Sequence, residues 1–145
     1  MKDNNCFYCE DGQKRHELMY EVCKMDLCTL YVLRNQKHRG RMVLKFDDHV
    51  PDISALSEDQ NRRFFGELRK VSAALMSLYH PDKINYAIYG DLVPHLHVHI
   101  VPKYKGGPEW GGPFVDGGEA KILDDAQLEE IAKAMRAELK KGEAK

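Results

Sequence analysis

The sequence has no segment that marks a membrane protein or a secreted one. None of its 145 residues belongs to a run approaching the ~20 consecutive apolar residues of a transmembrane helix. Residues 1–5 lack the apolar stretch that forms the centre of a signal peptide. We therefore expect a cytoplasmic protein without a membrane partner.

The sequence also has little excess charge of either sign. It contains 22 basic and 23 acidic residues, a formal net charge of −1. This balance provides no broad basic surface for nucleic acid, so no nucleic-acid partner is expected. Internal repeats and low-complexity tracts are absent as well. Because 43% of the residues are hydrophobic, the chain can bury one core, and we predict a single domain over residues 1–145.

Disulfide bonds are not expected, because a cytoplasmic protein keeps its thiols reduced. The chain has four cysteines: Cys6, Cys9, Cys23 and Cys28. The Cys6-x-x-Cys9 spacing is typical of metal or redox sites, but no βαβ pattern follows it, which disfavours thioredoxin-like chemistry. A metal site of all four cysteines is an alternative. It is less favoured because Cys23 and Cys28 fall in predicted strands, where cysteine packs as a small hydrophobe.

Apolar patterns and turn residues predict five strands. The strands fall at residues 18–23, 27–33, 42–46, 83–89 and 94–102, with the first two forming a hairpin. Two polar, glycine-containing segments are predicted loops, residues 10–15 and residues 106–113.

Two helices are predicted from apolar residues at helical spacing. Ser57 and Gln60 have the spacing of a capping box, and the pattern after them predicts a long amphipathic helix over residues 57–79, ending before Pro81. A final helix begins near Asp124. Its apolar face contains Leu128, Ile131, Met135 and Leu139. Strands combined with two helices in this order predict an α+β domain with a mostly antiparallel sheet.

Three histidines alternate along the predicted strand at residues 94–102: His95, His97 and His99. Successive side chains of a strand point to opposite faces, so the three imidazoles would share one face of the sheet. The residues between them would enter the core: Leu96, Val98 and Ile100. A histidine-rich surface strand without function is the alternative, but a structural strand rarely needs three titratable groups in line.

Two kinds of chemistry use imidazoles in this arrangement. Neutral imidazole is a common metal ligand, but the α-carbons of His95 and His99 would lie roughly 13 Å apart, so at most two neighbouring histidines can reach one metal. In phosphorus chemistry, one imidazole is the nucleophile and its neighbours donate hydrogen bonds to phosphate oxygens or protonate the leaving group. The two uses are compatible.

The histidine pattern and several flanking segments resemble the histidine triad (HIT) family of nucleotide hydrolases and transferases, in its bacterial branch. The pattern His-x-His-x-His, followed by apolar residues and proline, is met by residues 95–102. The other similar segments are Cys6-x-x-Cys9, residues 36–41, His49-Val50, residues 85–90 and residues 110–113. The resemblance covers about residues 6–115, and the histidine pattern is its most specific part.

The resemblance implies a HIT-like fold, with a mainly antiparallel meander sheet, one long helix and a C-terminal helix. It divides the domain into a zinc-knuckle segment at residues 1–16, a core at residues 17–115, and a C-terminal helix and tail at residues 116–145. It also implies a homodimer.

The resemblance further implies a nucleotidyl-histidine mechanism. His97 would attack the α-phosphorus of an AMP- or GMP-containing substrate, such as a phosphoramidate or a dinucleoside polyphosphate, while its near ring nitrogen donates to a backbone carbonyl of the same strand. His99 would bind the phosphate. His95, the third candidate catalytic residue, would lie beside the leaving group or bind metal. The expected substrate contacts are Asn85, Asp91, His99 and Trp110.

Zinc-bearing members of the family imply a structural Zn²⁺ here, bound by two thiolates and two imidazoles. The matching residues are Cys6, Cys9, His49 and His95. Thiolates and imidazoles suit zinc, and a site closed by four protein ligands is structural rather than catalytic.

Asp91 departs from the family pattern. Many members carry glutamine or asparagine after the glycine that corresponds to Gly90, whereas this chain has Asp91 there. A carboxylate beside a polyphosphate would repel it, so Asp91 points away, meets a cation or marks a different leaving group. Arg39 and Arg41 could offset phosphate charge or belong to a solvated basic loop. Two other functions stay open, namely a zinc-stabilised nucleotide- or partner-binding protein without significant turnover, and a hydrolase whose metal activates water at an open coordination position.

Overall fold

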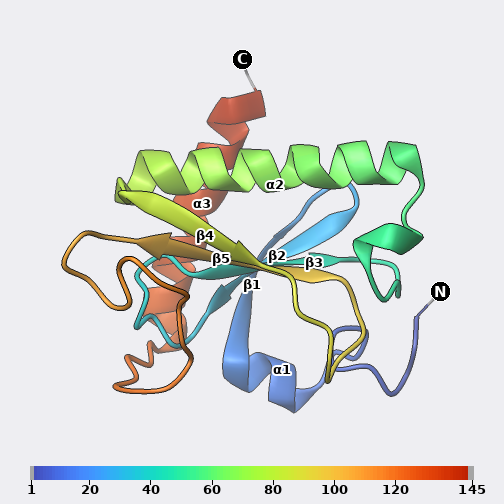
Figure 1. Cartoon of the computed structure of the whole chain (residues 1–145), viewed down its shortest axis with the longest axis horizontal. Helices are drawn as coiled ribbons and strands as arrows, with labels where there is room; N and C mark the ends of the chain where they lie inside the picture. Colours follow the sequence, from blue (N-terminus) through green and yellow to red (C-terminus); the bar gives the residue numbers. More distant parts are fainter. Residues whose placement is uncertain (1, 144–145) are drawn as a thin grey trace.

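A five-stranded sheet, antiparallel at every pairing, forms the centre of the molecule in the computed structural model, which describes residues 2–143 (Figure 1). The strand order is β1-β2-β3-β5-β4. The strands are β1 (Met19–Lys24), β2 (Cys28–Leu33), β3 (Met42–Phe46), β4 (Lys83–Ala87) and β5 (His97–Lys103). The predicted α+β class is confirmed. The one departure from a simple meander is that β5 lies between β3 and β4.

In the described part of the chain, four helical segments accompany the sheet: α1 (Gln13–Leu18), the 3-10 turn η1 (Ile53–Ala55), α2 (Glu58–Tyr79) and α3 (Asp125–Glu143). The predicted capping box of α2 is confirmed, because the Ser57 side chain accepts from Gln60 N and the Gln60 side chain accepts from Ser57 N. The helix ends at Tyr79, and the C-cap residue His80 adopts a left-handed conformation. Within residues 2–143, no helix is both long enough and apolar enough to span a membrane.

The prediction of a loop over residues 10–15 is wrong in part, because α1 begins at Gln13. None of the six residues of α1 is buried, so the helix has no apolar periodicity to reveal it in the sequence. Polar pairs about one turn apart support it instead: Arg15 bonds Asp11 at 2.5 Å and Gln13 bonds Glu17 at 2.8 Å.

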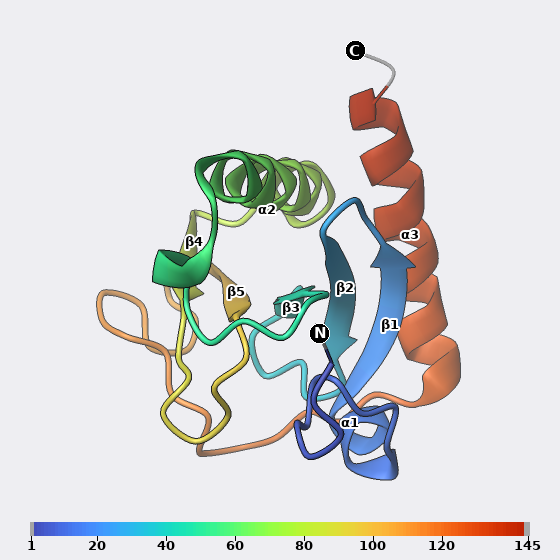
Figure 2. The same cartoon turned by 90° about the vertical axis from the view of Figure 1, so that its right-hand side faces the viewer.

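The main core lies between one face of the sheet and the helices α2 and α3. Figure 2 shows α2 across the sheet, with α3 along β1. As predicted, the residues between the histidines enter this core, and Leu96, Val98 and Ile100 are fully buried. Cys28 is also fully buried in the core, where burial raises the pKa of its thiol.

The N-terminal segment packs against the opposite face of the sheet, beside α1 (Figure 1). A second apolar cluster forms there: Cys6, Tyr8, Met19, Tyr31 and Val43. This packing carries the Cys6-x-x-Cys9 pair to the strand that contains the histidines. Residue 1 and residues 144–145 of the predicted domain lie outside the described residues.

Candidate functional site

Four potential metal ligands converge where the N-terminal segment meets the start of β5. They are Cys6, Cys9, His49 and His95, and their ligand atoms all lie within 4.8 Å of one another. His95 Nδ1 lies 3.4 Å from Sγ of Cys6 and 3.4 Å from Sγ of Cys9. It lies 3.3 Å from His49 Nδ1. Bonds of ~2.3 Å to sulfur and ~2.1 Å to nitrogen give tetrahedral edges of about 3.4–3.8 Å, so this donor set fits a tetrahedral metal.

His95 is oriented for this cluster by its second ring nitrogen. Its Nε2 donates to the Phe46 carbonyl oxygen at 2.6 Å, which leaves the lone pair on Nδ1, facing the two thiols. The residue is fully buried and lies two positions before the first residue of β5, so the histidine strand begins later than predicted. The structure therefore groups His95 with the cysteines and with His49.

His97 is held by its near nitrogen. Nδ1 donates to the His95 carbonyl oxygen at 2.6 Å, because a carbonyl can only accept. The proton therefore lies on Nδ1 and the lone pair on Nε2, for which no hydrogen-bond partner occurs among residues 2–143. Burial lowers the pKa of His97, so its ring is neutral near pH 7. A neutral imidazole with a free Nε2 can act as a nucleophile.

His99 has the opposite hydrogen-bonding arrangement. Arg41 Nη2 donates to His99 Nδ1 at 3.1 Å, and the ring centroids of His97 and His99 lie 5.2 Å apart. Burial, followed by the Arg41 guanidinium, lowers the pKa of His99 to about 4. His99 is therefore neutral near pH 7, and its Nε2 carries the proton.

A largely apolar cleft of about 540 Å³ opens over these two imidazoles. Besides His97 and His99 it is lined by Phe7, Tyr8, Leu18, Tyr89, Gly90, Asp91, Leu92 and Val93. The Tyr8 ring lies against His97, with centroids 4.3 Å apart. Leu92 is 96% exposed at the rim, an unusual position for a large apolar side chain. The cleft can thus accept a flat apolar group beside a polar, phosphate-sized one.

The predicted substrate contacts do not all meet in this cleft. Asp91 and His99 line it, with the Asp91 side chain exposed at the rim. Asn85 and Trp110 instead line a second hollow beyond β5, where Lys103 Nζ donates to Asn85 Oδ1 at 3.2 Å. The structure therefore divides the four predicted contacts between two surfaces.

Comparison with known proteins connects this geometry to a family. A family model described as HIT domain matches residues 18–106. The chain belongs to the HIT domain family. An uncharacterized HIT-like protein of Methanocaldococcus jannaschii is 26% identical over 133 residues, covering 87% of this chain and 98% of that protein. A bis(5'-adenosyl)-triphosphatase of Saccharomyces cerevisiae is 36% identical over 61 residues, covering 39% of this chain and only 30% of the yeast enzyme.

Solved structures of HIT proteins share the fold. A histidine triad protein from Marinobacter aquaeolei superposes with a TM-score of 0.81 at 22% identity, covering 91% of this chain and 96% of that one. A zinc-bound histidine triad family protein from Mycobacterium smegmatis gives a TM-score of 0.59 at 18% identity, covering 86% of each chain. The HIT-like fold predicted from the sequence is confirmed.

The histidines of the HIT domain make contacts that the sequence patterns do not indicate. Tyr8, between the two cysteines, packs against His97, and Asp116 pairs with Arg41 at 2.5 Å. The sequence leaves Arg41 as either a phosphate contact or a solvated residue, whereas its side chain is buried and contacts His99. These partners lie far apart in the chain, so no local spacing signals them. Arg39 is exposed and lies over the Tyr79 ring.

The lowered pKa of His99 predicts a pH-dependent stability. In the unfolded chain this imidazole titrates near pH 6.5, whereas in the folded HIT domain, facing Arg41, Asp116 and His97, it titrates at about 4. Between these values only the unfolded state binds the proton, so stability falls as the pH falls. We expect His99→Gln to reduce the loss of unfolding free energy between pH 7 and pH 5 by about 2 kcal/mol, measured by urea titration. An unchanged pH dependence would contradict the assignment.

Proposed function

We propose that this HIT protein cleaves activated nucleotides at the α-phosphorus through a covalent nucleotidyl-His97 intermediate. The observation that carries the proposal is the 2.6 Å hydrogen bond from His97 Nδ1 to the His95 carbonyl oxygen, which leaves the Nε2 lone pair available for attack. A bond forms between Nε2 and phosphorus as the bond from phosphorus to the leaving group breaks, and the leaving group takes a proton from solvent. Attack by water or another acceptor then breaks the nitrogen–phosphorus bond and releases the nucleotide.

The surroundings of His97 support this role. The Nε2–H group of neutral His99 can donate a hydrogen bond to a non-bridging phosphate oxygen, on which negative charge develops during the attack. The apolar wall formed by Phe7, Leu18 and Tyr89 offers a surface for a nucleobase. The proposed substrates contain AMP or GMP, as phosphoramidates or dinucleoside polyphosphates. The yeast relative's activity on a bis(5'-adenosyl) triphosphate supports this class.

We further propose that the metal is a structural zinc. Two thiolates and two imidazoles suit zinc, and four protein donors leave no position for a reactive water, which disfavours a hydrolase with a metal-activated water. When bound, the ion would fasten the N-terminal segment to His95, two residues before β5 begins. Such a site requires reduced thiols, in keeping with a cytoplasmic location.

A second candidate function is nucleotide binding without turnover. The Asp91 carboxylate at the cleft rim favours it, because a negative charge there opposes a polyphosphate leaving group. Incubation with a panel of adenosine and guanosine phosphoramidates and dinucleoside polyphosphates distinguishes the two functions. Catalysis predicts release of AMP or GMP from at least one substrate. Binding of AMP or GMP without release from any of them would favour the binding protein.

We also propose that the HIT domain forms a homodimer through the open edge of β4. Within residues 2–143 this strand pairs only with β5, and Tyr86 on it is 49% exposed while contacting Ser72 of α2. An open strand edge with an apolar side chain is a common site of sheet extension.

Light scattering tests the dimer. We expect twice the chain mass for the wild type and the monomer mass for Tyr86→Glu, because a buried carboxylate opposes association. Ile122→Glu, at an apolar residue 65% exposed elsewhere, is the control and should stay dimeric. A monomeric wild type at tens of micromolar would contradict the proposal.

A further inference from the structure

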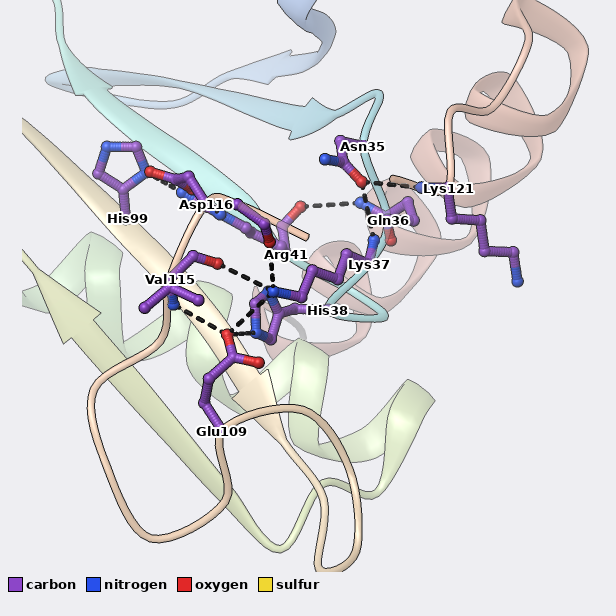
Figure 3. A network of polar contacts seen from close by, with 11 residues as sticks. Asn35, Gln36, Lys37, His38, Arg41, His99, Glu109, Val115, Asp116 and Lys121 are labelled. Carbon is purple, nitrogen blue, oxygen red and sulfur yellow. Dashed lines mark hydrogen bonds and ion pairs between the residues drawn. The ribbon is translucent and has the colours of Figure 1, made fainter. Parts of the chain in front are cut away.

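Arg41 connects β5 to the loop that follows this strand. Its side chain is buried, yet its guanidinium forms two polar contacts in different directions (Figure 3). Nη2 donates to His99 Nδ1 at 3.1 Å, and Nη1 donates to Asp116 Oδ1 at 2.5 Å. The guanidinium also lies over the Phe114 ring, 4.9 Å from its centroid. The residue is thus fixed on three sides.

The contact with His99 determines where that imidazole carries its proton. A guanidinium stays protonated and has no acceptor atom, so His99 Nδ1 must accept and Nε2 must carry the hydrogen. In His97 the bond to the His95 carbonyl requires the reverse, with the hydrogen on Nδ1. We propose that Arg41, held by Asp116, is a positioning residue that fixes His99 in the Nε2–H tautomer, opposite to that of His97.

A hydrogen-bonded cluster around Glu109, here called the polar latch, holds the segment that contains Asp116; its other members are Lys37, His38 and Val115. Glu109 Oε1 accepts from Lys37 Nζ at 3.2 Å, from His38 Nε2 at 3.0 Å and from Val115 N at 2.8 Å. Lys37 Nζ also donates to the Gly117 carbonyl oxygen at 2.7 Å, so the residues on both sides of Asp116 are held by hydrogen bonds. The latch therefore attaches the loop after β5 to the segment before β3.

The remaining guanidinium nitrogen shows what orients Arg41. Its Nε is buried and has no hydrogen-bond partner among residues 2–143. A buried N–H without an acceptor opposes folding, so Arg41 is not buried here because all of its N–H groups find hydrogen-bond partners. The contacts with His99 and Asp116 explain its placement instead.

The opposite tautomers of His97 and His99 give the two imidazoles different roles. The assignment of these roles rests on the proposed function. His97 presents a lone pair to phosphorus, while His99 presents a hydrogen to a phosphate oxygen. In the reverse tautomer of His99, the Nε2 lone pair would face that oxygen and repel it. Loss of Arg41 should therefore affect the transition state, in which the oxygen gains charge, more than nucleotide binding.

Nitrogen-15 NMR of histidine-labelled protein tests the tautomers directly. In the wild type we expect an unprotonated Nδ1 and a protonated Nε2 for His99, and the reverse for His97. Arg41→Met retains the length but no donor, and should convert His99 to a mixture of tautomers. Arg41→Lys retains a charged donor group and should restore much of the wild-type signal. Amide spectra report whether each variant is folded.

Asp116→Asn provides a second variant, since the Asp116 side chain is 73% exposed and its replacement leaves the core intact. Asp116→Asn should move the His99 nitrogen signals part of the way from the wild-type values toward those of Arg41→Met. Arg34→Met is the matched control, because Arg34 forms an equivalent 2.5 Å pair with Asp125, whose side chain is 76% exposed, and does not contact His99. It should leave both histidines unchanged.

The kinetic result separates this inference from the proposed function. We expect Arg41→Met to lower kcat by about 10- to 100-fold while AMP binding changes less than threefold. If the wild type turns over no nucleotide but the NMR result holds, the proposed function fails and the positioning role stands. If His99 keeps the Nε2–H tautomer in folded Arg41→Met, or lacks it in the wild type, the positioning role is wrong.

Discussion

Replacement of His97 by asparagine is expected to lower nucleotide turnover by at least about 10³-fold and to abolish any covalent nucleotidyl adduct. The asparagine Nδ2 can still donate to the His95 carbonyl, so the hydrogen bond of the native residue has a substitute. What the variant lacks is the Nε2 lone pair. The expected loss is large because the other imidazole that lines the cleft, His99, carries a proton on Nε2 and so offers no lone pair there for the bond to phosphorus.

Two measurements make this result specific. Thermal unfolding should show that His97→Asn remains folded, and AMP binding should persist because the cleft walls are unchanged. His16→Asn is the control, since His16 is an exposed residue of α1 that pairs with Asp11. Turnover by His97→Asn within tenfold of the wild type would contradict a histidine nucleophile at this position.

Loss of the metal site is expected to have the largest effect on stability. We expect Cys6→Ser, or treatment with a strong chelator, to lower the free energy of unfolding by about 4 kcal/mol and the Tm by on the order of 10 °C. The four ligands come from segments as far apart as residues 6 and 95, so a shared ion ties the N-terminal segment to the sheet. Without it, two thiols and two imidazoles remain packed together with few other partners.

Metal analysis and a matched variant complete this test. The wild type should contain about one zinc per chain, and Cys6→Ser should contain little. Cys23→Ser is the control, because Cys23 is a half-buried thiol outside the cluster and should keep the metal. A protein without metal, or a chelated protein of unchanged Tm, would contradict the structural zinc.

The same experiment probes a connection between the metal and His97. His95 contributes Nδ1 to the cluster and its carbonyl oxygen to His97 Nδ1. A chelated protein that remains folded should therefore lose part of its turnover, because His97 is held less firmly. If a metal-activated water were the nucleophile, chelation would abolish turnover completely.

The sequence predicts the parts of this molecule that follow local periodicity. Alternation placed Leu96, Val98 and Ile100 in the core, and the spacing of Ser57 and Gln60 located the start of α2. The helix α1 is not predicted from the sequence, because polar pairs stabilise it and it has no apolar residues at helical spacing.

Contacts between distant segments depend on the fold and were predicted only where a family resemblance supplied them. Cys6 and His95 are 89 residues apart, and only the resemblance to zinc-bearing HIT proteins joined them in advance. No such guide existed for Arg41 and Asp116, which are 75 residues apart, and the buried position of Arg41 could not be predicted from a segment rich in charged residues. Likewise, the sequence does not reveal that Trp110 lines a surface other than the histidine cleft.

The most direct test of the proposed mechanism is to locate the covalent intermediate. The wild-type protein is mixed with an activated nucleotide that it turns over, quenched within the first turnover at alkaline pH, where phosphohistidine bonds survive, and digested for mass spectrometry. The mechanism predicts one nucleotidyl group per chain, attached to His97. An adduct on any other residue, or turnover without an adduct at His97 under single-turnover conditions, would contradict it.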